Sequence, residues 1–248
     1  MEAFFEWFRW LYDATGINLT IFYDGFDRKR MIAGFWMTVF LCVVCIALSI
    51  VIGVVGAWLQ GSSLKWTRRA VQGFIVVFRN TPPLVQIYFF YFGLGALLPR
   101  TPNAFGIPEP PLTSLQWAII SLSLFAGAFN VEIFRSGIEA VPRATVEAAE
   151  ALGYSRLRAY IHVVLPLAVR ICLPALNNNI VNLVKTTTLA YAIAVPEMLY
   201  VSKQIWSDAT NVPEMMVFLL IAYVFLVGCV VAIMSRIERS LRVPGIGL

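Results

Sequence analysis

Two charged side chains interrupt stretches that are otherwise apolar and long enough to cross a membrane. Lys185 lies within residues 171–196, and Glu132 ends the uncharged residues 110–131. A charge at such a place is costly unless it faces a polar path or a partner. An ion pair of Glu132 with Lys185 or with Arg135 would fix how the helices align. A Lys185 that faces a polar path would instead contact whatever moves along it.

Uncharged polar side chains flank these two charges. Asn177, Asn178 and Asn179 follow one another, and Thr186 and Thr188 come directly after Lys185. Three consecutive residues cover most of a helical turn, so only one or two of the asparagines can face a path together with a threonine. Amides and hydroxyls in apolar helices also hold helices to one another. Both roles stay open for these residues, and also for Gln86 and Asn130.

The residue types that enzymes and metal sites require are scarce. His162 is the single histidine, and no HExxH pattern or cysteine-rich cluster occurs. Cys42 and Cys45 have a CxxC spacing inside an apolar stretch without a nearby histidine or acid, as small core residues do. No G-x-x-x-x-G-K-[ST] phosphate loop is present. The sequence therefore predicts no enzyme, no metal site and no cofactor held by this chain.

The elements that must position these side chains are membrane helices. Of the 248 residues 59% are hydrophobic and 13% are charged, too apolar a balance for a soluble domain. About 20 apolar residues span a membrane as a helix, and five runs approach or exceed that length. We expect an all-α integral membrane protein of about five helices. The runs are residues 31–64, with a helix end near Gly61, then 80–99, 110–131, 171–196 and 215–235.

Basic residues indicate the orientation, because cytoplasmic loops collect Lys and Arg. An outside N-terminus and a cytoplasmic C-terminus place twelve of the nineteen inside, although Arg28, Lys29 and Arg30 oppose this topology. Residues 1–30 contain five acids and many aromatics but no apolar core of signal-peptide length. They are expected to be a retained interfacial segment. The net charge of +5 is spread over loops, so no nucleic-acid partner is expected.

One long loop, residues 135–170, has recognisable content. Helix formers from 146 to 152 precede Gly153, where a helix can turn left-handed and stop. Ser155 can cap a second helix over 156–165, with Leu157, Tyr160, Ile161 and Val164 on one face and an end at Pro166. The loop is thus predicted to be a rigid helix pair that lies on the bilayer or docks a partner.

Residue types in this loop favour docking. Glu147, Ala148 and Ala149, then Gly153, then Leu165 and Pro166 resemble the EAA motif of ABC importer permeases. Val163 stands where that motif has Ile. Ala144 and Thr145 replace the family's usual Gly-Gln, which leaves the strength of coupling open.

Three further motifs resemble the polar amino-acid branch of the same family, and together the four cover about residues 34–243. The segment from Arg79 to Gln86 resembles RGTPLLVQ, with Asn80 in place of Gly and an extra Pro83. The other two resemble E-I-x-R-x-G-I and LPQAxR…P-x-L-x-N…K-x-T-S-L. Their matching residues are Glu132, Arg135, Gly137 and Ile138, then Leu165, Pro166, Arg170, Pro174, Asn177, Lys185 and Leu189.

The resemblance implies a type I (MetI-like) permease fold in a bacterial inner membrane. It also implies two copies of a cytoplasmic ABC ATPase that binds ATP-Mg, a second permease chain, identical or homologous, and an external solute-binding protein. Residues 31–243 would form the transmembrane domain, with Glu147, Ala148, Ala149, Gly153, Leu165 and Pro166 coupling to the ATPase, and 244–248 a tail.

The expected function is ATP-driven import of polar amino acids, including acidic or amide ones. Lys185 would accept a substrate carboxylate, and the expected pathway residues are Lys185, Glu132, Asn177, Thr186, Thr188 and Gln86. The alternatives are a basic amino acid or an opine as the solute, or an ion-coupled carrier. A carrier would show internal repeats, and none is seen.

Overall fold

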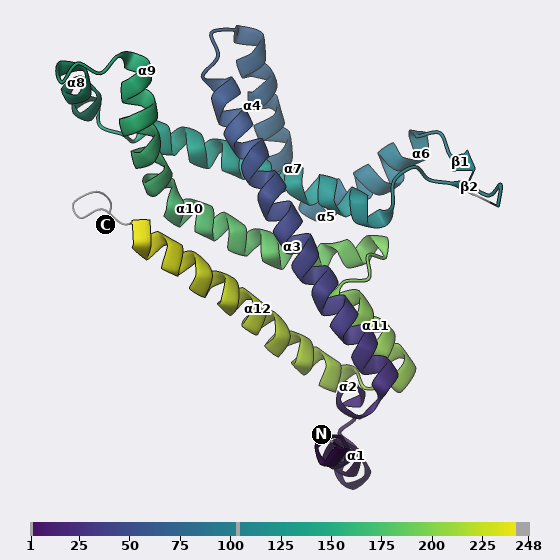
Figure 1. Cartoon of the computed structure of the whole chain (residues 1–248). Coiled ribbons are helices and arrows are strands. Elements are labelled where there is room, and N and C mark those ends of the chain that lie inside the picture. The colour runs from purple at the N-terminus through teal and green to yellow at the C-terminus, as the bar shows by residue number, and fades with distance from the viewer. Residues whose placement is uncertain (1, 103–104, 242–248) are drawn as a thin grey trace. The chain divides into compact units, whose positions relative to one another are not determined.

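The computed structural model describes residues 2–102 and 105–241, so the expected tail at 244–248 lies outside the described residues. Within these residues the regular secondary structure is helical apart from a small antiparallel hairpin of β1 (Thr101–Pro102) and β2 (Pro108–Glu109) (Figure 1). It divides into two compact units. The first comprises Met1–Val44, Leu84–Ser121 and Val184–Gly228; the second comprises Cys45–Pro83, Leu122–Leu183 and Cys229–Leu248.

Four helical stretches of the described residues are long and apolar enough to cross a membrane, which confirms the multi-pass prediction. A shorter apolar stretch, Pro83–Leu97, corresponds to the predicted second span, so a count of five crossings stays a prediction. The short stretch contains α5 (Pro83–Tyr88), η1 (Phe89–Leu94) and α6 (Gly95–Leu97). The four long ones are α3 (Gly25–Gln60), α7 (Ser114–Glu139), Arg156–Ile193 and α12 (Val212–Leu241).

The N-terminal segment carries two short helices, α1 (Glu2–Thr15) and α2 (Thr20–Tyr23). Phe8 of α1 stacks on Phe22, with ring centroids 4.4 Å apart, while Trp7 and Trp10 are exposed. The first long helix begins six residues earlier than residue 31, because an Asp24 oxygen accepts the backbone N–H groups of the next turn. Its end at Gln60 confirms the predicted stop at Gly61.

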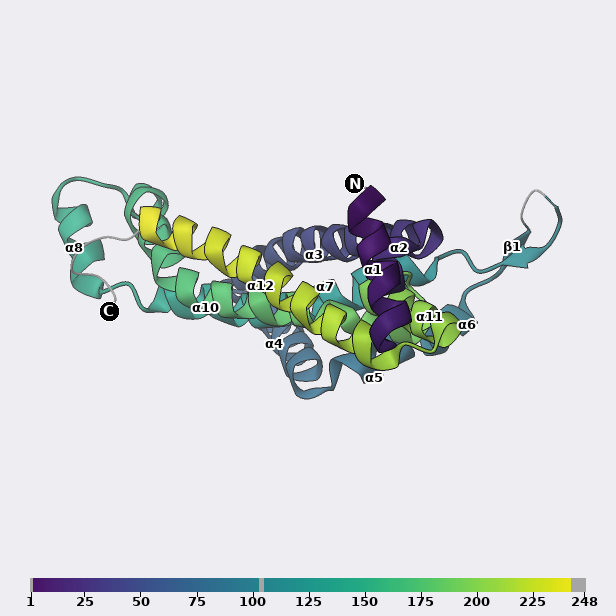
Figure 2. The same ribbon diagram turned by 90° about the horizontal axis from the view of Figure 1, so that it is seen from below.

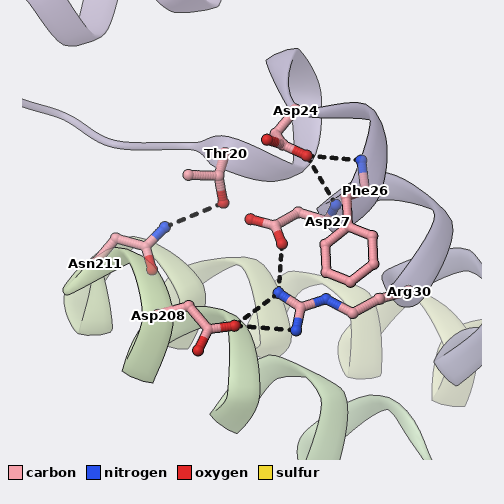
Figure 3. A network of polar contacts seen from close by, with 7 residues as sticks. All are labelled: Thr20, Asp24, Phe26, Asp27, Arg30, Asp208 and Asn211. Carbon is pink, nitrogen blue, oxygen red and sulfur yellow. Dashed lines mark hydrogen bonds and ion pairs between the residues drawn. The ribbon is translucent and has the colours of Figure 1, made fainter.

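The first unit packs the start of α3 against α11 (Met198–Ala209) and the start of α12. Arg30, from the basic triplet that opposes the predicted topology, is not a free charge. Its guanidinium contacts Asp27 and lies 3.0 Å from the Asp208 carboxylate (Figure 3). Nearby, the Asn211 side chain donates to the Asn18 carbonyl at 2.7 Å and so joins the N-terminal segment to the start of the last helix. Two acids therefore neutralise Arg30, one of the three basic residues that the predicted topology places on the unexpected side of the membrane.

The second unit brings α3, α7 and α10 (Leu165–Thr186) together through glycines, and also contains α4 (Lys65–Asn80). A Cβ on Gly56 would lie 2.3 Å from a Val131 methyl, and one on Gly137 would lie 2.0 Å from the Cys172 sulfur. Real side chains do not approach so closely. Glycine is therefore required here for the helix backbones to come together.

Candidate functional site

The predicted helix pair is present in the second unit. It consists of α8 (Arg143–Ala151) and α9 (Arg156–Ala159). Gly153 adopts a φ of +87°, and its N–H donates to the Glu150 carbonyl at 2.9 Å, so the left-handed glycine turn is confirmed. Ser155 caps α9 by accepting the N–H of Arg158, as predicted.

The predicted end of the second helix at Pro166 is wrong. A π-helical turn, η2 (Tyr160–Val164), follows α9 and leads without a break into α10. The Leu165 N–H donates to the Tyr160 carbonyl, five residues back. This wider turn accommodates a proline that has no N–H to donate and whose ring would clash in a regular helix. The helix pair is consequently continuous with a membrane helix, and in both views it extends beyond that helix's N-terminal end (Figures 1 and 2).

The pair presents an exposed surface and anchors itself by a smaller buried one. Ala149 and Val164 are buried, and Val164 belongs to a cluster with Val141 and Ala168. Leu152 is 80% exposed and Leu157 68% exposed at the two sides of the glycine turn. Exposed apolar side chains on a rigid projection are typical of a contact surface. Around them Glu147, Ala148 and Gly153 are exposed as well, together with Tyr154, Arg156 and Arg158.

Glu132 forms the local ion pair that was one of the two structural alternatives. The Arg135 guanidinium contacts the Glu132 carboxylate and also lies 2.7 Å from Glu139. Lys185, in the last turn of α10, is exposed, and no ion pair among residues 2–102 and 105–241 includes it. A lysine without a carboxylate partner is available to a ligand.

The consecutive asparagines have different environments. Asn179 is buried and donates to Asn130 at 2.7 Å and to the Ala126 carbonyl at 3.0 Å. It therefore holds helices together, which was one of its two predicted roles. Asn178 is exposed. Asn177 has a buried side-chain oxygen that accepts no hydrogen bond within the described chain, so this amide has an acceptor to spare.

The threonines after Lys185 change the helix type. Thr187 and Thr188 bond the carbonyls of Val184 and Lys185 at 2.7 and 2.8 Å, and the chain tightens into the 3₁₀ helix η3 (Thr187–Ile193). Lys185, Thr186 and Thr188 thus lie together at this junction in the first unit. Gln86 is buried on α5 of the same unit, whereas Glu132 and Asn177 belong to the second.

A buried carboxyl group in the first unit was not among the predicted site residues. Glu197 has no exposed surface and caps α11 by accepting the N–H groups of Leu199 and Tyr200 at 2.9 and 2.7 Å. The Tyr223 hydroxyl donates to it at 2.9 Å. Burial raises the pKa of Glu197 to about 7, against the lowering effect of these donors. The available signal was an acid directly after Pro196, at the start of an apolar helix.

Four long apolar helices, with an exposed helix pair leading into one of them, define a multi-pass membrane protein. Residues 49–243 match the model of the family described as binding-protein-dependent transport system inner membrane component. The chain therefore belongs to this family, and it is a multi-pass inner-membrane transport protein.

Individual relatives resemble the chain over most of its length. It is 30% identical to the probable glutamine ABC transporter permease protein GlnM of Bacillus subtilis (strain 168), over 85% of this chain and 91% of that protein. It is 32% identical to the histidine/lysine/arginine/ornithine transport system permease protein HisM of Salmonella typhimurium, over 83% and 87%. The octopine transport system permease protein OccM of Rhizobium radiobacter is 32% identical over 74% of each chain.

Solved structures have the same fold. An amino acid ABC transporter crystallised with histidines is similar with a TM-score of 0.75 and 26% identity, over 86% of this chain and 94% of that one. An inward-facing MetNI methionine ABC transporter is similar with a TM-score of 0.65 at 20% identity, over 87% and 98%. These similarities confirm the expected importer permease fold.

Proposed function

We propose that this chain is the translocating subunit of an ATP-driven importer of polar amino acids, and that α8 and α9 dock a separate ATPase. One observation carries the proposal. The exposed helix pair around Gly153 is continuous, through η2, with a membrane helix that carries Lys185 near its other end. Movement of the pair by a partner then moves the membrane helix, and the two ends are coupled as allostery requires.

The assignment of the motor to another subunit follows from the absence of a phosphate loop in the sequence. Two ATPase copies that bind ATP-Mg would grip the helix pairs of two permease chains, and an external binding protein would deliver the solute. The relatives named for glutamine, for histidine and other basic amino acids, and for octopine support an amino-acid-like solute.

Within that class, Lys185 favours a solute with an accessible carboxylate. Its ammonium group is exposed, the next residues are threonines rather than acids, and no described carboxylate neutralises it. The spare acceptor of Asn177 would bind a donor such as an ammonium or amide group. Import of a polar amino acid, acidic or amide, is the expected result.

Reconstitution tests the division of labour. The chain is purified alone and with a candidate ATPase and binding protein, and uptake of labelled amino acids is measured with ATP or with an ion gradient. ATP-dependent uptake by the complex only is expected. Uptake by the chain alone, driven by an ion gradient, contradicts the proposal. Screening amino acids for stimulation of ATP hydrolysis in the same vesicles then identifies the solute.

A further inference from the structure

A polar pocket of about 730 Å³ lies in the second unit, where α4 begins beside the end of α3 and the last turns of α7. It is separate from the predicted pathway residues except for Glu132. Its wall is unusual for a membrane helix bundle, because every lining residue is charged or an amide. The lining residues are Gln60, Lys65, Arg68, Arg69, Gln72, Glu132 and Arg135.

The charges in this wall do not balance. Arg135 is engaged by Glu132 and Glu139, so the acid of the pocket is already paired. Lys65, Arg68 and Arg69 are exposed, and none of them has an ion-pair partner in the part of the chain that the structure describes. Their spacing of i, i+3 and i+4 places the three on one face of α4. The pocket therefore presents about three uncompensated positive charges to an anion.

Apolar side chains around the pocket show where it lies relative to the membrane. Trp58 is 75% exposed near the end of α3, and Trp66 is 80% exposed in the first turn of α4, where Arg69 lies 5.6 Å from its ring centroid. Exposed tryptophans beside basic residues are typical of the headgroup region of a bilayer. Further along α4, Val71 and Ile75 pack against Val131 of α7. The basic face is thus held in place at the membrane boundary.

We propose that this pocket binds the phosphate of an anionic phospholipid. The three cations of the pocket complement the negative charge of the phosphate. Val76 and Val77, which are exposed two turns further along α4, offer apolar surface to an acyl chain. A soluble anion or an acidic surface of an ATPase would have no use for the adjoining tryptophans and valines. A neighbouring pocket joins Arg135 and Glu139 to Tyr160 at the base of the coupling pair, so the lipid would lie beside the moving part.

The lipid binding itself does not depend on the proposed function. ATPase docking at α8 and α9 would in addition place the pocket at the cytoplasmic leaflet, and this placement rests on the proposed function. The test therefore uses the full chain alone, in nanodiscs of phosphatidylcholine with one part in five phosphatidylglycerol. The phosphatidylglycerol retained after extraction into mild detergent is counted by native mass spectrometry.

The variant is Arg68→Gln with Arg69→Gln, and the control is Arg236→Gln with Arg239→Gln, which removes two charges from α12 instead. About a 25-fold loss of retained phosphatidylglycerol is expected in the variant, because each of the two basic side chains near a membrane surface contributes about fivefold. Retention in the control is expected to match the wild type. Equal losses in both double variants would mean a general charge effect and would overturn the proposal.

Two further measurements distinguish the occupant. Glycerol phosphate or inorganic phosphate at millimolar concentration should fail to displace the lipid, whereas displacement would indicate a site for free anions and overturn the lipid proposal. The emission of Trp66 is obtained as the difference between the wild type and Trp66→Phe. Brominated phosphatidylglycerol should quench this emission more than brominated phosphatidylcholine does. Equal quenching by the two lipids contradicts the proposal. If the wild type retains no phosphatidylglycerol and Arg68→Gln with Arg69→Gln weakens ATPase binding, the pocket is a protein contact and the lipid proposal is overturned.

Discussion

The side-chain nitrogen of Asn179 on α10 lies 2.7 Å from the side-chain oxygen of Asn130 on α7, and Asn130 in turn donates to the Ser49 hydroxyl of α3 at 3.1 Å. Three membrane helices of the second unit are therefore joined by one chain of hydrogen bonds. In an apolar surrounding each such bond stabilises helix association by about 1 kcal/mol. This chain of bonds is a means of fixing helix alignment that needs no charge.

Replacing Asn130 by Leu should remove both bonds and leave Asn179 with one acceptor. A loss of about 1–2 kcal/mol is expected, seen as a lower melting temperature of the purified chain in detergent. Asn178→Leu is the control, because Asn178 is exposed one position away on α10. Equal melting temperatures for the two variants would show that the hydrogen bonds contribute nothing.

A methyl group at Gly137 should separate α7 from α10. Gly137→Ala places a Cβ 2.0 Å from the Cys172 sulfur and is expected to cost about 1–3 kcal/mol in thermal stability. Cys172→Ala removes that sulfur, so the double variant should recover most of the loss. A Cβ on Gly73 of α4 has nothing within 4 Å, so Gly73→Ala is the control and should not lose stability. No recovery in the double variant would rule out this contact as the cause.

Two substitutions of Gly153 test whether ATP-coupled uptake needs the left-handed turn at this position. Gly153→Val should be strained at φ +87° and abolish ATP-coupled uptake while leaving membrane insertion unchanged. Gly153→Asn should retain part of the uptake, because asparagine tolerates left-handed backbone. Uptake is compared in vesicles that contain equal amounts of each variant. Normal coupling in the valine variant counts against docking at this turn.

Capping by Glu197 predicts an asymmetry between two substitutions. The N–H groups of Leu199 and Tyr200 donate to different oxygens of Glu197, so Glu197→Gln keeps one acceptor for them, whereas Glu197→Ala leaves both donors without a partner. The alanine variant should lose about 1–2 kcal/mol more than the glutamine variant in thermal unfolding. Tyr223→Phe, which removes a single donor, should lie between wild type and alanine. An equal loss in the alanine and glutamine variants would refute the capping role.

The proposed role of Lys185 in the substrate pathway can be tested through the range of transported amino acids. Lys185→Met should reduce uptake of the transported amino acid at least tenfold and most strongly for acidic ones, because a carboxylate loses its cation. Competition by a panel of unlabelled amino acids provides the measurement. Unchanged uptake with an unchanged panel would exclude contact between this lysine and the substrate.

Local signals in the sequence predicted the parts of the site that are locally determined. The Gly153 turn and the Ser155 cap involve residues within a few positions of one another, and both were found where the residue types indicated. A role of Asn179 in hydrogen bonding between helices could be proposed from the sequence but could not be distinguished from ligand contact. Its partner Asn130 is 49 residues away, and only the packed helices fix which asparagine faces which helix.

Other features depend on distant residues or on a change of helix type. Asp208 neutralises Arg30 across 178 residues, so a count of loop charges treated that arginine as free. Tyr223 reaches Glu197 across 26 residues, and glutamate is not among the preferred helix caps. Pro166 was read as a stop, because a proline usually ends a helix, and only the preceding π turn reveals how the helix continues.

That turn also has a meaning for how such chains diverge. A π turn is equivalent to one residue inserted into an α-helix, and each residue advances an α-helix by about 100° and 1.5 Å. The wider turn absorbs that extra residue, so α9 and α10 keep about the relative orientation that a regular helix with one residue fewer would give them. A chain with one residue fewer in Tyr160–Val164 would therefore have a different spacing between Gly153 and Pro166 but a helix pair in a similar orientation. The π turn thus allows the length of this segment to differ by one residue without rotating α8 and α9 relative to α10.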